Sequence, residues 1–193
     1  MYFTVKRFMD ICCSVIFLLL FWWLFLIIAI LIVAEDKGTI LFKQKRVGKN
    51  KSEFYIYKFR TMKMNTPKDT PTHLLENPES YITRVGGFLR RSSLDELPQL
   101  FNILKGEMTI VGPRPALYNQ YDLIAQRDKY NANNVAPGLT GWAQINGRDE
   151  LPIDIKAELD GEYVKKMSLG FDIIIILKTI VAVFKADGIK EGK

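Results

Sequence analysis

The sequence has little of what many enzymes use for catalysis: it holds one histidine, His73, and two adjacent cysteines, Cys12 and Cys13. A single histidine excludes a histidine-rich metal cluster and argues against chemistry built on histidine bases. The cysteines lie inside an apolar run, where they are expected to pack as small hydrophobic side chains rather than to form a disulfide or bind a metal. Catalysis would therefore rest on carboxylates, lysines, arginines or backbone amides.

Length and charge set further bounds. The 193 residues suffice for one domain with a membrane element, and not for two ordinary domains. The 27 Lys and Arg against 21 Asp and Glu give a net charge of +6. This charge suits phospholipid head groups, phosphorylated small molecules or nucleic acid, and by itself does not choose among them.

A further absence marks the N-terminal segment. No proline or glycine lies between Met9 and Ala34, and no charged residue lies between Ile11 and Ala34. As a helix, these 24 uncharged residues would be about 36 Å long, enough to cross a hydrocarbon core of about 30 Å. We therefore expect residues 1–36 to form a membrane-embedded helix that stays attached, and residues 37–193 to form a cytoplasmic domain.

Both flanks of this helix are basic. Lys6 and Arg7 precede it, and residues 35–63 contain nine Lys/Arg against three Asp/Glu. Because an excess of Lys/Arg marks cytoplasmic flanks, the pattern favours a re-entrant helix that dips into one leaflet and returns. A straight span stays open as the alternative, since the sequence contains no helix breaker.

The C-terminal run Phe171–Lys185 is apolar on most sides and too short to span a bilayer. It is expected to be either a core helix or an amphipathic helix in the membrane interface. Two features would support a bend in the N-terminal helix: the Trp22-Trp23 pair packing against this C-terminal run, and Ser14 bonding back to the helix backbone.

Local patterns predict a hairpin and a short helix. Two β-rich runs flank Gly48-Lys49-Asn50, which is typical of a hairpin. Apolar residues at 94, 97, 100, 101 and 104 form a helical stripe that ends at Gly106. Between these elements, residues 64–80 contain three prolines and predict a surface loop.

Two later segments predict loops that face a ligand. Leu104–Pro115 reads as a turn, a short strand and a rigid loop that presents Arg114 between two prolines, which favours recognition of a planar anion or phosphate. Pro137–Arg148 has three glycines and ends in Asn-Gly-Arg, which predicts a second such loop.

The stretch SLDELPQL sets two carboxylates, Asp95 and Glu96, side by side at the head of the predicted short helix. The structural explanation is a capping box, with Ser93 as the N-cap and Glu96 at the third helical position. The alternative is an acid pair that works in catalysis. On the same helix, Asp95, Gln99 and Asn102 share the face opposite the apolar stripe.

Taken together, five blocks resemble those of the bacterial sugar transferase family, the small monotopic phosphoglycosyl transferases that act on polyprenyl phosphate. In chain order they are KRFMD (Lys6–Asp10), YKFRTM (Tyr57–Met62), SLDELPQLFNILKGEM (Ser93–Met108), VGPRP (Val111–Pro115) and PGLTGWAQINGR (Pro137–Arg148). They keep the family's order and spread over almost the whole chain. The resemblance implies an α+β fold: an N-terminal re-entrant membrane helix, a short β-hairpin, and a mainly helical cytoplasmic catalytic domain with interfacial amphipathic helices.

The resemblance also implies an activity. Members transfer a phosphosugar from a UDP-sugar to undecaprenyl phosphate, release UMP and need Mg²⁺. Such an enzyme would catalyse the first membrane step of a bacterial surface glycan, such as a capsule, O-antigen, exopolysaccharide or glycoprotein glycan, on the cytoplasmic face of the inner membrane. Homo-oligomerisation is left open.

By the same resemblance, Asp95 is the nucleophile that takes up the phosphosugar and a ligand of the metal, and Glu96 handles the proton of the acceptor phosphate. The expected substrate-binding cations are Lys58, Arg90, Arg114 and Arg148, with Arg60 added on charge and position. The chain departs from the family at one point: many members carry a Ser-Pro pair midway along the membrane segment, where this sequence has FWWL, residues 21–24.

Three other functions compete with this one. A glycosyltransferase would pass only the sugar and release UDP. A basic membrane adaptor would bind anionic lipids without catalysis, but would have no need of an acid pair framed by arginines. Nucleic-acid binding would use the aromatic residues near the hairpin, and the membrane segment and acid pair argue against it.

Overall fold

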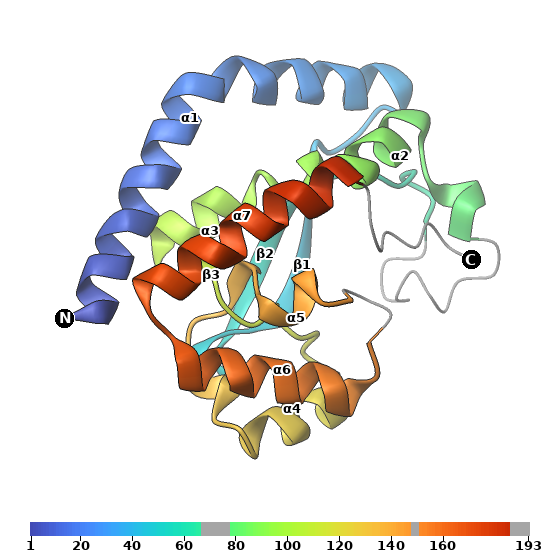
Figure 1. Ribbon diagram of the computed structural model, residues 1–193. Helices are drawn as coiled ribbons and strands as arrows, with labels where there is room; N and C mark the ends of the chain where they lie inside the picture. The colour runs from blue at the N-terminus through green and yellow to red at the C-terminus, as the bar shows by residue number, and fades with distance from the viewer. Residues whose placement is uncertain (67–77, 148–150, 186–193) are drawn as a thin grey trace.

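The computed structural model describes residues 1–66, 78–147 and 151–185, which fold as the expected α+β arrangement (Figure 1). A long helix, α1 (Tyr2–Glu35), is followed by the antiparallel hairpin of β1 (Leu41–Val47) and β2 (Glu53–Phe59), joined by the 3-10 turn η1 (Lys49–Lys51). The remaining elements are η3 (Pro78–Tyr81), α2 (Arg84–Arg91), η4 (Leu94–Glu96), α3 (Gln99–Lys105), β3 (Thr109–Val111), α4 (Tyr121–Asp128), η5 (Ala132–Asn134), β4 (Gly138–Thr140), α5 (Trp142–Ile145), α6 (Ile153–Lys166) and α7 (Leu169–Lys185). His73 and most of the expected 64–80 loop lie outside the described residues.

The predicted hairpin is confirmed, and its register explains how it packs. Alternate residues of a strand point to opposite faces, so Phe54 and Ile56 are buried while Tyr55 between them is exposed. The buried face packs on α3 in a core cluster with Leu100 and Ile103. Lys58 continues the same alternation, which brings its side chain to the α3 side of the hairpin.

The predicted helical stripe is also confirmed, although the helix is interrupted. Helix α3 ends at Gly106, as the sequence predicts, and this glycine has a left-handed backbone (φ 85°). Pro98 directly precedes α3, so the proline marks a second start after the 3-10 turn η4. This position is tolerable because a proline near a helix start removes little backbone bonding.

Helix α1 bends, and Figure 1 shows its two arms. Phe21 leaves the helical backbone at the bend (φ −117°, ψ 18°). Trp23 Nε1 donates to the carbonyl oxygen of Leu20 at 3.0 Å, so the indole supplies a partner for a backbone group at the break. In a lipid environment such a group needs an internal partner.

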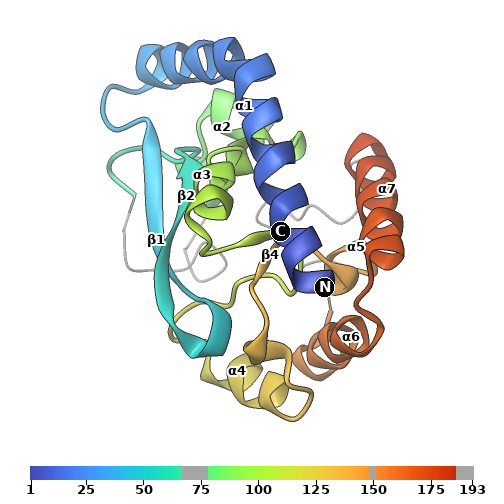
Figure 2. The same ribbon diagram turned by 90° about the vertical axis from the view of Figure 1, so that its left-hand side faces the viewer.

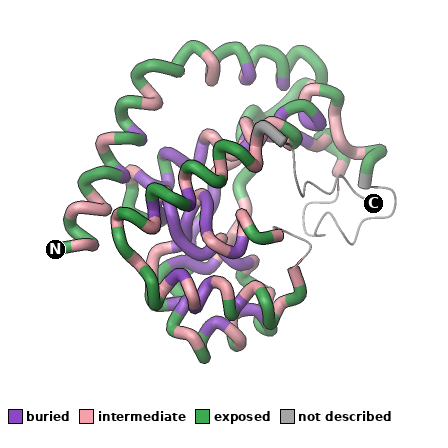
Figure 3. The backbone as a smooth tube through the Cα atoms, in the orientation of Figure 1, coloured by how far each residue is buried: buried purple, intermediate pink, exposed green. Residues whose placement is uncertain are grey.

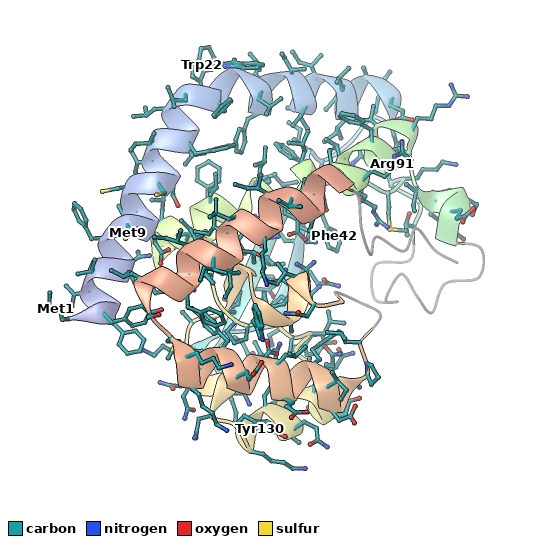
Figure 4. The ribbon with its side chains drawn as sticks, in the orientation of Figure 1. Met1, Met9, Trp22, Phe42, Arg91 and Tyr130 are labelled. Atoms are coloured by element: carbon teal, nitrogen blue, oxygen red, sulfur yellow. The ribbon has the colours of Figure 1, made fainter. Side chains whose placement is uncertain are left out.

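The two features expected to support the bend do not act as predicted. Trp22 and Trp23 are 64% and 47% exposed, and Trp22 points away from the domain (Figure 4), so the pair does not pack on α7. The Ser14 hydroxyl is buried without a hydrogen-bond partner among the described residues. Local bonding of an indole replaces both expected contacts.

The first arm of α1 is anchored to the domain by the charged residues of KRFMD. The contacts are Lys6 Nζ to Asp172 Oδ2 at 2.7 Å, Arg7 to the carbonyl oxygens of Ile103 at 2.5 Å and Leu104 at 2.9 Å, and Asp10 to Thr109 Oγ1 at 2.6 Å and the Ile110 backbone N–H at 3.0 Å. Three charges thus bind three different elements, α7, α3 and β3.

The end of α1 is anchored to the same domain. The Glu35 carboxylate accepts from the backbone N–H groups of Arg84 at 2.6 Å and Val85 at 2.9 Å, at the start of α2. Asp36 Oδ2 pairs with Arg60 at 2.5 Å. Both ends of the apolar helix therefore lie on one side, against one globular body.

Apolar side chains remain exposed on α1 and α7. Within the described ranges, α1 is the one helix long and apolar enough to cross a membrane, and most of it is exposed (Figure 3). Helix α7 buries Ile175 and exposes Ile173, Leu177 and Val181 on another face. Figure 2 shows α7 and the hairpin on opposite sides of the molecule. The exposed apolar face of α7 agrees with an interfacial helix more than with a core helix.

Candidate active site

The acid pair lies in η4, between α2 and α3, and it is not a capping box. Ser93 has a left-handed backbone (φ 57°) and its side chain caps nothing in η4. Asp95 is 8% exposed and Glu96 is partly buried. The structural explanation from the sequence is therefore wrong, because Glu96 turns to side chains of distant segments and does not reach back to Ser93.

Two cations hold Glu96. Lys58 Nζ, from β2, donates to Glu96 Oε1 at 2.7 Å, and Arg114 donates to both carboxylate oxygens, at 2.7 Å and 3.4 Å. Lys58 Nζ also lies 3.8 Å from Asp95 Oδ2, beyond hydrogen-bond distance. Lys58 and Arg114 thus join the acid pair in one partly buried cluster.

The two carboxyl groups experience opposite electrostatic effects. Burial raises the pKa of Asp95 above its ordinary value, and the neighbouring Glu96 charge adds to this, against the opposing charges of Lys58, Arg114 and Arg90. Burial also opposes ionisation of Glu96, but the charges and hydrogen bonds of Arg114 and Lys58 outweigh it and hold the pKa of Glu96 well below its ordinary value. Pairs of acids whose pKa values are driven apart are typical of active sites.

Helix α2 positions Arg90 near this cluster. Arg90 Nε donates to Thr61 Oγ1 at 2.9 Å, just after β2, and its charge acts on Asp95. The close approach of α2 to this segment requires Gly86, because a Cβ at that position would stand 2.0 Å from the Thr61 carbonyl oxygen. Thr83 caps the helix by accepting from the Gly86 N–H at 2.9 Å.

The loop that carries Arg114 is fixed from two sides. On one side, Arg46 of β1 donates to the Pro115 carbonyl oxygen at 3.0 Å. On the other, β3 pairs in parallel with β4, and the Gly138 N–H donates to the Pro113 carbonyl oxygen at 2.8 Å. A Cβ at Gly138 would stand 2.1 Å from the Gly112 nitrogen, so only glycine allows this approach. The second predicted loop therefore begins as a strand that supports the Arg114 loop.

One further predicted cation, Arg60, is not part of this cluster. Arg60 is buried and its guanidinium binds Asp36 at the end of α1, through the carboxylate and the backbone carbonyl, so it stabilises the α1 junction. Lys58, two residues earlier in the chain, binds Glu96 instead. Arg148 lies outside the described residues.

Close to the acid pair in the chain, Gln99 at the start of α3 is a buried polar side chain to which the sequence assigned no role. Gln99 is 1% exposed, and its Nε2 has no hydrogen-bond partner among the described residues. Asn102, one turn further on, is fully bonded to Tyr55, Tyr57 and Glu107. The sequence pattern that could have drawn attention to Gln99 is the helix face that it shares with Asp95 and Asn102, because that pattern puts Gln99 about one turn from Asp95.

Asp95 suits a shared magnesium site better than a closed one. Among the described residues, no three His, Cys, Asp or Glu side chains gather to hold a metal. Mg²⁺ prefers oxygen ligands and is commonly held by one or two carboxylates together with substrate phosphates and water. The Asp95 carboxylate fits such a role, with a diphosphate supplying further oxygens.

The acid pair lies among Lys58, Arg90 and Arg114, on a domain tied to both ends of a long apolar helix. These features are those of a membrane-associated protein, and a cluster of three cations suits an anionic ligand. The chain belongs to the bacterial sugar transferase family, whose sequence model matches residues 1–186.

Curated relatives agree with this family. A UDP-N-acetylgalactosamine-undecaprenyl-phosphate N-acetylgalactosaminephosphotransferase of Aeromonas hydrophila is 39% identical over 97% of the chain and 45% of its own length. A UDP-glucose:undecaprenyl-phosphate glucose-1-phosphate transferase of Xanthomonas campestris pv. campestris is 42% identical over 94% of the chain and 39% of its own length. An uncharacterized sugar transferase, EpsL, of Bacillus subtilis is 38% identical over 97% of the chain and 91% of its own length. The chain thus spans less than half of the first two relatives and nearly all of the third.

Proposed function

We propose that this chain transfers a phosphosugar from a UDP-sugar to undecaprenyl phosphate and releases UMP, with Asp95 as the nucleophile. The observation that carries the proposal is the unequal acid pair: Glu96 is bonded to two cations, while Asp95 beside it makes no contact with Lys58 closer than 3.8 Å. The names of the Aeromonas and Xanthomonas relatives support the donor and acceptor classes.

In the first step the Asp95 carboxylate attacks the sugar-bearing β-phosphorus. A bond forms between the carboxylate oxygen and phosphorus, and the bond between phosphorus and the bridging oxygen breaks. UMP leaves with that electron pair, and a phosphosugar-aspartyl intermediate remains. A covalent intermediate of this kind divides one difficult transfer into two easier ones.

Lys58, Arg90 and Arg114 supply positive charge around the reacting phosphoryl group. Phosphoryl transfer depends mainly on in-line positioning and on neutralising the equatorial oxygens, which requires no histidine. When a diphosphate enters, its oxygens compete with Glu96 for Lys58 and Arg114. Glu96 therefore holds these cations in position before the substrate arrives.

In the second step an oxygen of the acceptor phosphate attacks the same phosphorus, and the bond to Asp95 breaks with return of its electron pair to the carboxylate. A phosphate monoester has a second pKa of about 6, so the acceptor is largely dianionic at neutral pH. Any proton that remains would pass to Glu96 only after Lys58 and Arg114 have moved to the substrate, because they lower the pKa of Glu96. Mg²⁺, held by Asp95 and the diphosphate, would neutralise charge on the donor.

The anchoring of α1 supports a re-entrant position in the cytoplasmic membrane. Lys6 and Glu35, near its two ends, both bind the domain that carries Asp95. A straight span would separate one of these ends from the domain. With both flanks basic, the catalytic domain would lie on the cytoplasmic face.

Product analysis tests the reaction. The purified protein is incubated with undecaprenyl phosphate, Mg²⁺ and a panel of UDP-sugars that includes UDP-glucose, UDP-galactose and UDP-N-acetylgalactosamine. We expect UMP and a lipid diphosphate sugar with at least one donor. Release of UDP would indicate a glycosyltransferase, and absence of turnover with every donor would favour the adaptor.

A further inference from the structure

An apolar groove runs beneath the second arm of α1. It has a volume of about 530 Å³, and its lining is almost entirely apolar. Its walls come from three elements far apart in the sequence: Phe25 and Ala29 of α1, Leu41 at the start of β1, and Phe101 of α3. Phe25 and Phe101 are near neighbours, with ring centroids 6.2 Å apart.

The groove begins close to the acid pair in the chain. Phe59 and Pro98 line the groove, and each lies within three residues of a charged member of the active site. Phe59 follows Lys58 in β2, so the strand that carries Lys58 on one face contributes to the groove lining with its other face. Pro98 stands three residues after Asp95, and residues three apart in a helical turn lie on the same side.

A charged region and an apolar region therefore lie side by side. Lys58 and Arg114 lie around the acid pair, while the apolar lining of the groove includes Pro98, within one helical turn of Asp95. Lys43, on the groove wall, has its ammonium over the Tyr57 ring, 5.5 Å from the centroid. A ligand that fits both parts has an anionic head and a single long apolar tail.

The geometry points to the groove as the site for the isoprenoid units of polyprenyl phosphate that lie next to its phosphate. This inference rests on the proposed function and assigns the tail-binding part of the same site. A volume of about 530 Å³ lies within the range of small-molecule pockets, about 300–1,000 Å³, so the groove holds the first part of the tail and the rest enters the bilayer. A phosphodiester lipid with two tails matches this site less well, because a phosphodiester is a poorer nucleophile than a phosphate monoester toward a phosphosugar on Asp95.

Photo-crosslinking tests the location directly. The full-length protein in lipid nanodiscs is irradiated with a polyprenyl phosphate that carries a diazirine in its second isoprene unit, and labelled peptides are mapped by mass spectrometry. We expect labels on the segments that contain Phe25–Ala29 and Pro98–Phe101, displaced by unlabelled polyprenyl phosphate. Labels confined to the exposed face of α7, or displaced equally well by phosphatidylglycerol, would overturn the inference.

A matched pair of variants tests the consequence for activity. Ala29→Phe fills the groove, whereas Ile30→Phe adds an aromatic ring at an exposed neighbouring position that does not line it. We expect Ala29→Phe to raise the KM for polyprenyl phosphate about tenfold, which corresponds to about 1.4 kcal/mol of lost binding, and Ile30→Phe to leave it at the wild-type value.

The acceptor-free release of UMP separates the possible failures. If Ala29→Phe releases UMP in the first step as the wild type does and its KM for the acceptor is also unchanged, the groove assignment is wrong and the proposed function stands. If the wild type itself releases no UMP with any UDP-sugar, the proposed function fails, and the groove assignment fails with it.

Discussion

At the scale of single residues, Asp95 and Glu96 are adjacent in sequence but differ in their surroundings. Glu96 is bonded to Lys58 and Arg114, and these contacts keep it ionised. Asp95 is more buried, and the Lys58 ammonium lies 3.8 Å from its Oδ2, beyond hydrogen-bond distance. Its raised pKa makes Asp95 a more basic carboxylate. A more basic carboxylate suits the role of a nucleophile better than the role of a partner in a structural ion pair.

The pH dependence of the first step should report this difference. Only ionised Asp95 can attack, so UMP release should fall as the pH drops through its raised pKa, above the ordinary value of about 3.9. Glu96→Gln removes a negative charge that raises this pKa, so the acid limb should move to lower pH. Arg114→Gln removes a positive charge that lowers it, so the limb should move to higher pH. Single-turnover UMP release across pH is the measurement, and shifts of both variants in the same direction would contradict the assignment.

Gln99 and Asn102 provide a contrast in stability. Asn102→Leu leaves the backbone carbonyl oxygen of Tyr55 and the backbone N–H of Tyr57 without their side-chain partner. Each unsatisfied buried group costs about 1–3 kcal/mol. Gln99→Met removes an amide whose Nε2 has no hydrogen-bond partner among the described residues, and it should change the free energy of unfolding by less than about 1 kcal/mol. Denaturant unfolding of both variants tests this. A loss for Gln99→Met as large as that for Asn102→Leu would show that Gln99 is bonded to a group such as an ordered water.

At the scale of elements, Gly86 sets how closely α2 approaches the end of β2. Gly86→Ala should destabilise the protein by about 1–3 kcal/mol, although alanine is the better helix former, because the added Cβ meets the Thr61 carbonyl oxygen at 2.0 Å. It should also lower activity through displacement of Arg90. Gly170→Ala in α7 is the matched control, since a Cβ there meets nothing within 4 Å. Thermal unfolding that ranks the two variants equally would contradict this account.

One indole donor satisfies a backbone group at the bend of α1. Trp23→Phe keeps an aromatic ring but leaves the Leu20 carbonyl oxygen without its bond, which should favour a straight span by about 1 kcal/mol, or about fivefold. Trp22→Phe is the control, since Trp22 is the more exposed of the pair.

A cysteine placed at Thr4, in a background without Cys12 and Cys13, reports this change. Labelling on intact cells with a membrane-impermeant thiol reagent should be low for the parent and for Trp22→Phe, and higher for Trp23→Phe. Strong labelling of the parent itself would refute the re-entrant topology.

Elements with local signals could be predicted from the sequence, and contacts between distant segments could not. The turn at Gly48-Lys49-Asn50 and the end of α3 at Gly106 are determined by neighbouring residues, so both predictions are confirmed. The partners of Glu96 come from β2 and from the loop after β3, and no local pattern indicates them. The capping box failed for this reason, since a local hydrogen bond competed with two ion pairs from elsewhere in the fold.

The bend at Phe21 and the position of Arg60 illustrate the same limit. A helix without proline or glycine gives no local reason to break, and the donor that satisfies the break is an indole two residues further on. Arg60 lies in a matching motif beside Lys58, yet it binds Asp36 because the end of α1 folds back onto the domain. Spacing in the sequence does not reveal which of two nearby cations faces the acid pair.

At the scale of the whole molecule, α1 forms an arch whose two ends lie on one domain (Figure 1). The acid pair lies within that domain, and the apolar groove lies under the second arm. In the proposed function, this arrangement would bring a water-soluble donor and a membrane-bound acceptor to one carboxylate. The central claim is therefore that Asp95 carries the phosphosugar between them.

The most direct test of that claim is the mass of the protein after reaction with the donor alone. Without acceptor, the wild type should release about one equivalent of UMP per chain, as expected for a covalent intermediate, and should gain the mass of one phosphosugar on the peptide that contains Asp95. Asp95→Asn should stay folded and membrane-bound, with neither UMP release nor added mass. A mass increase that persists in Asp95→Asn, or wild-type turnover without any covalent adduct, would contradict the account.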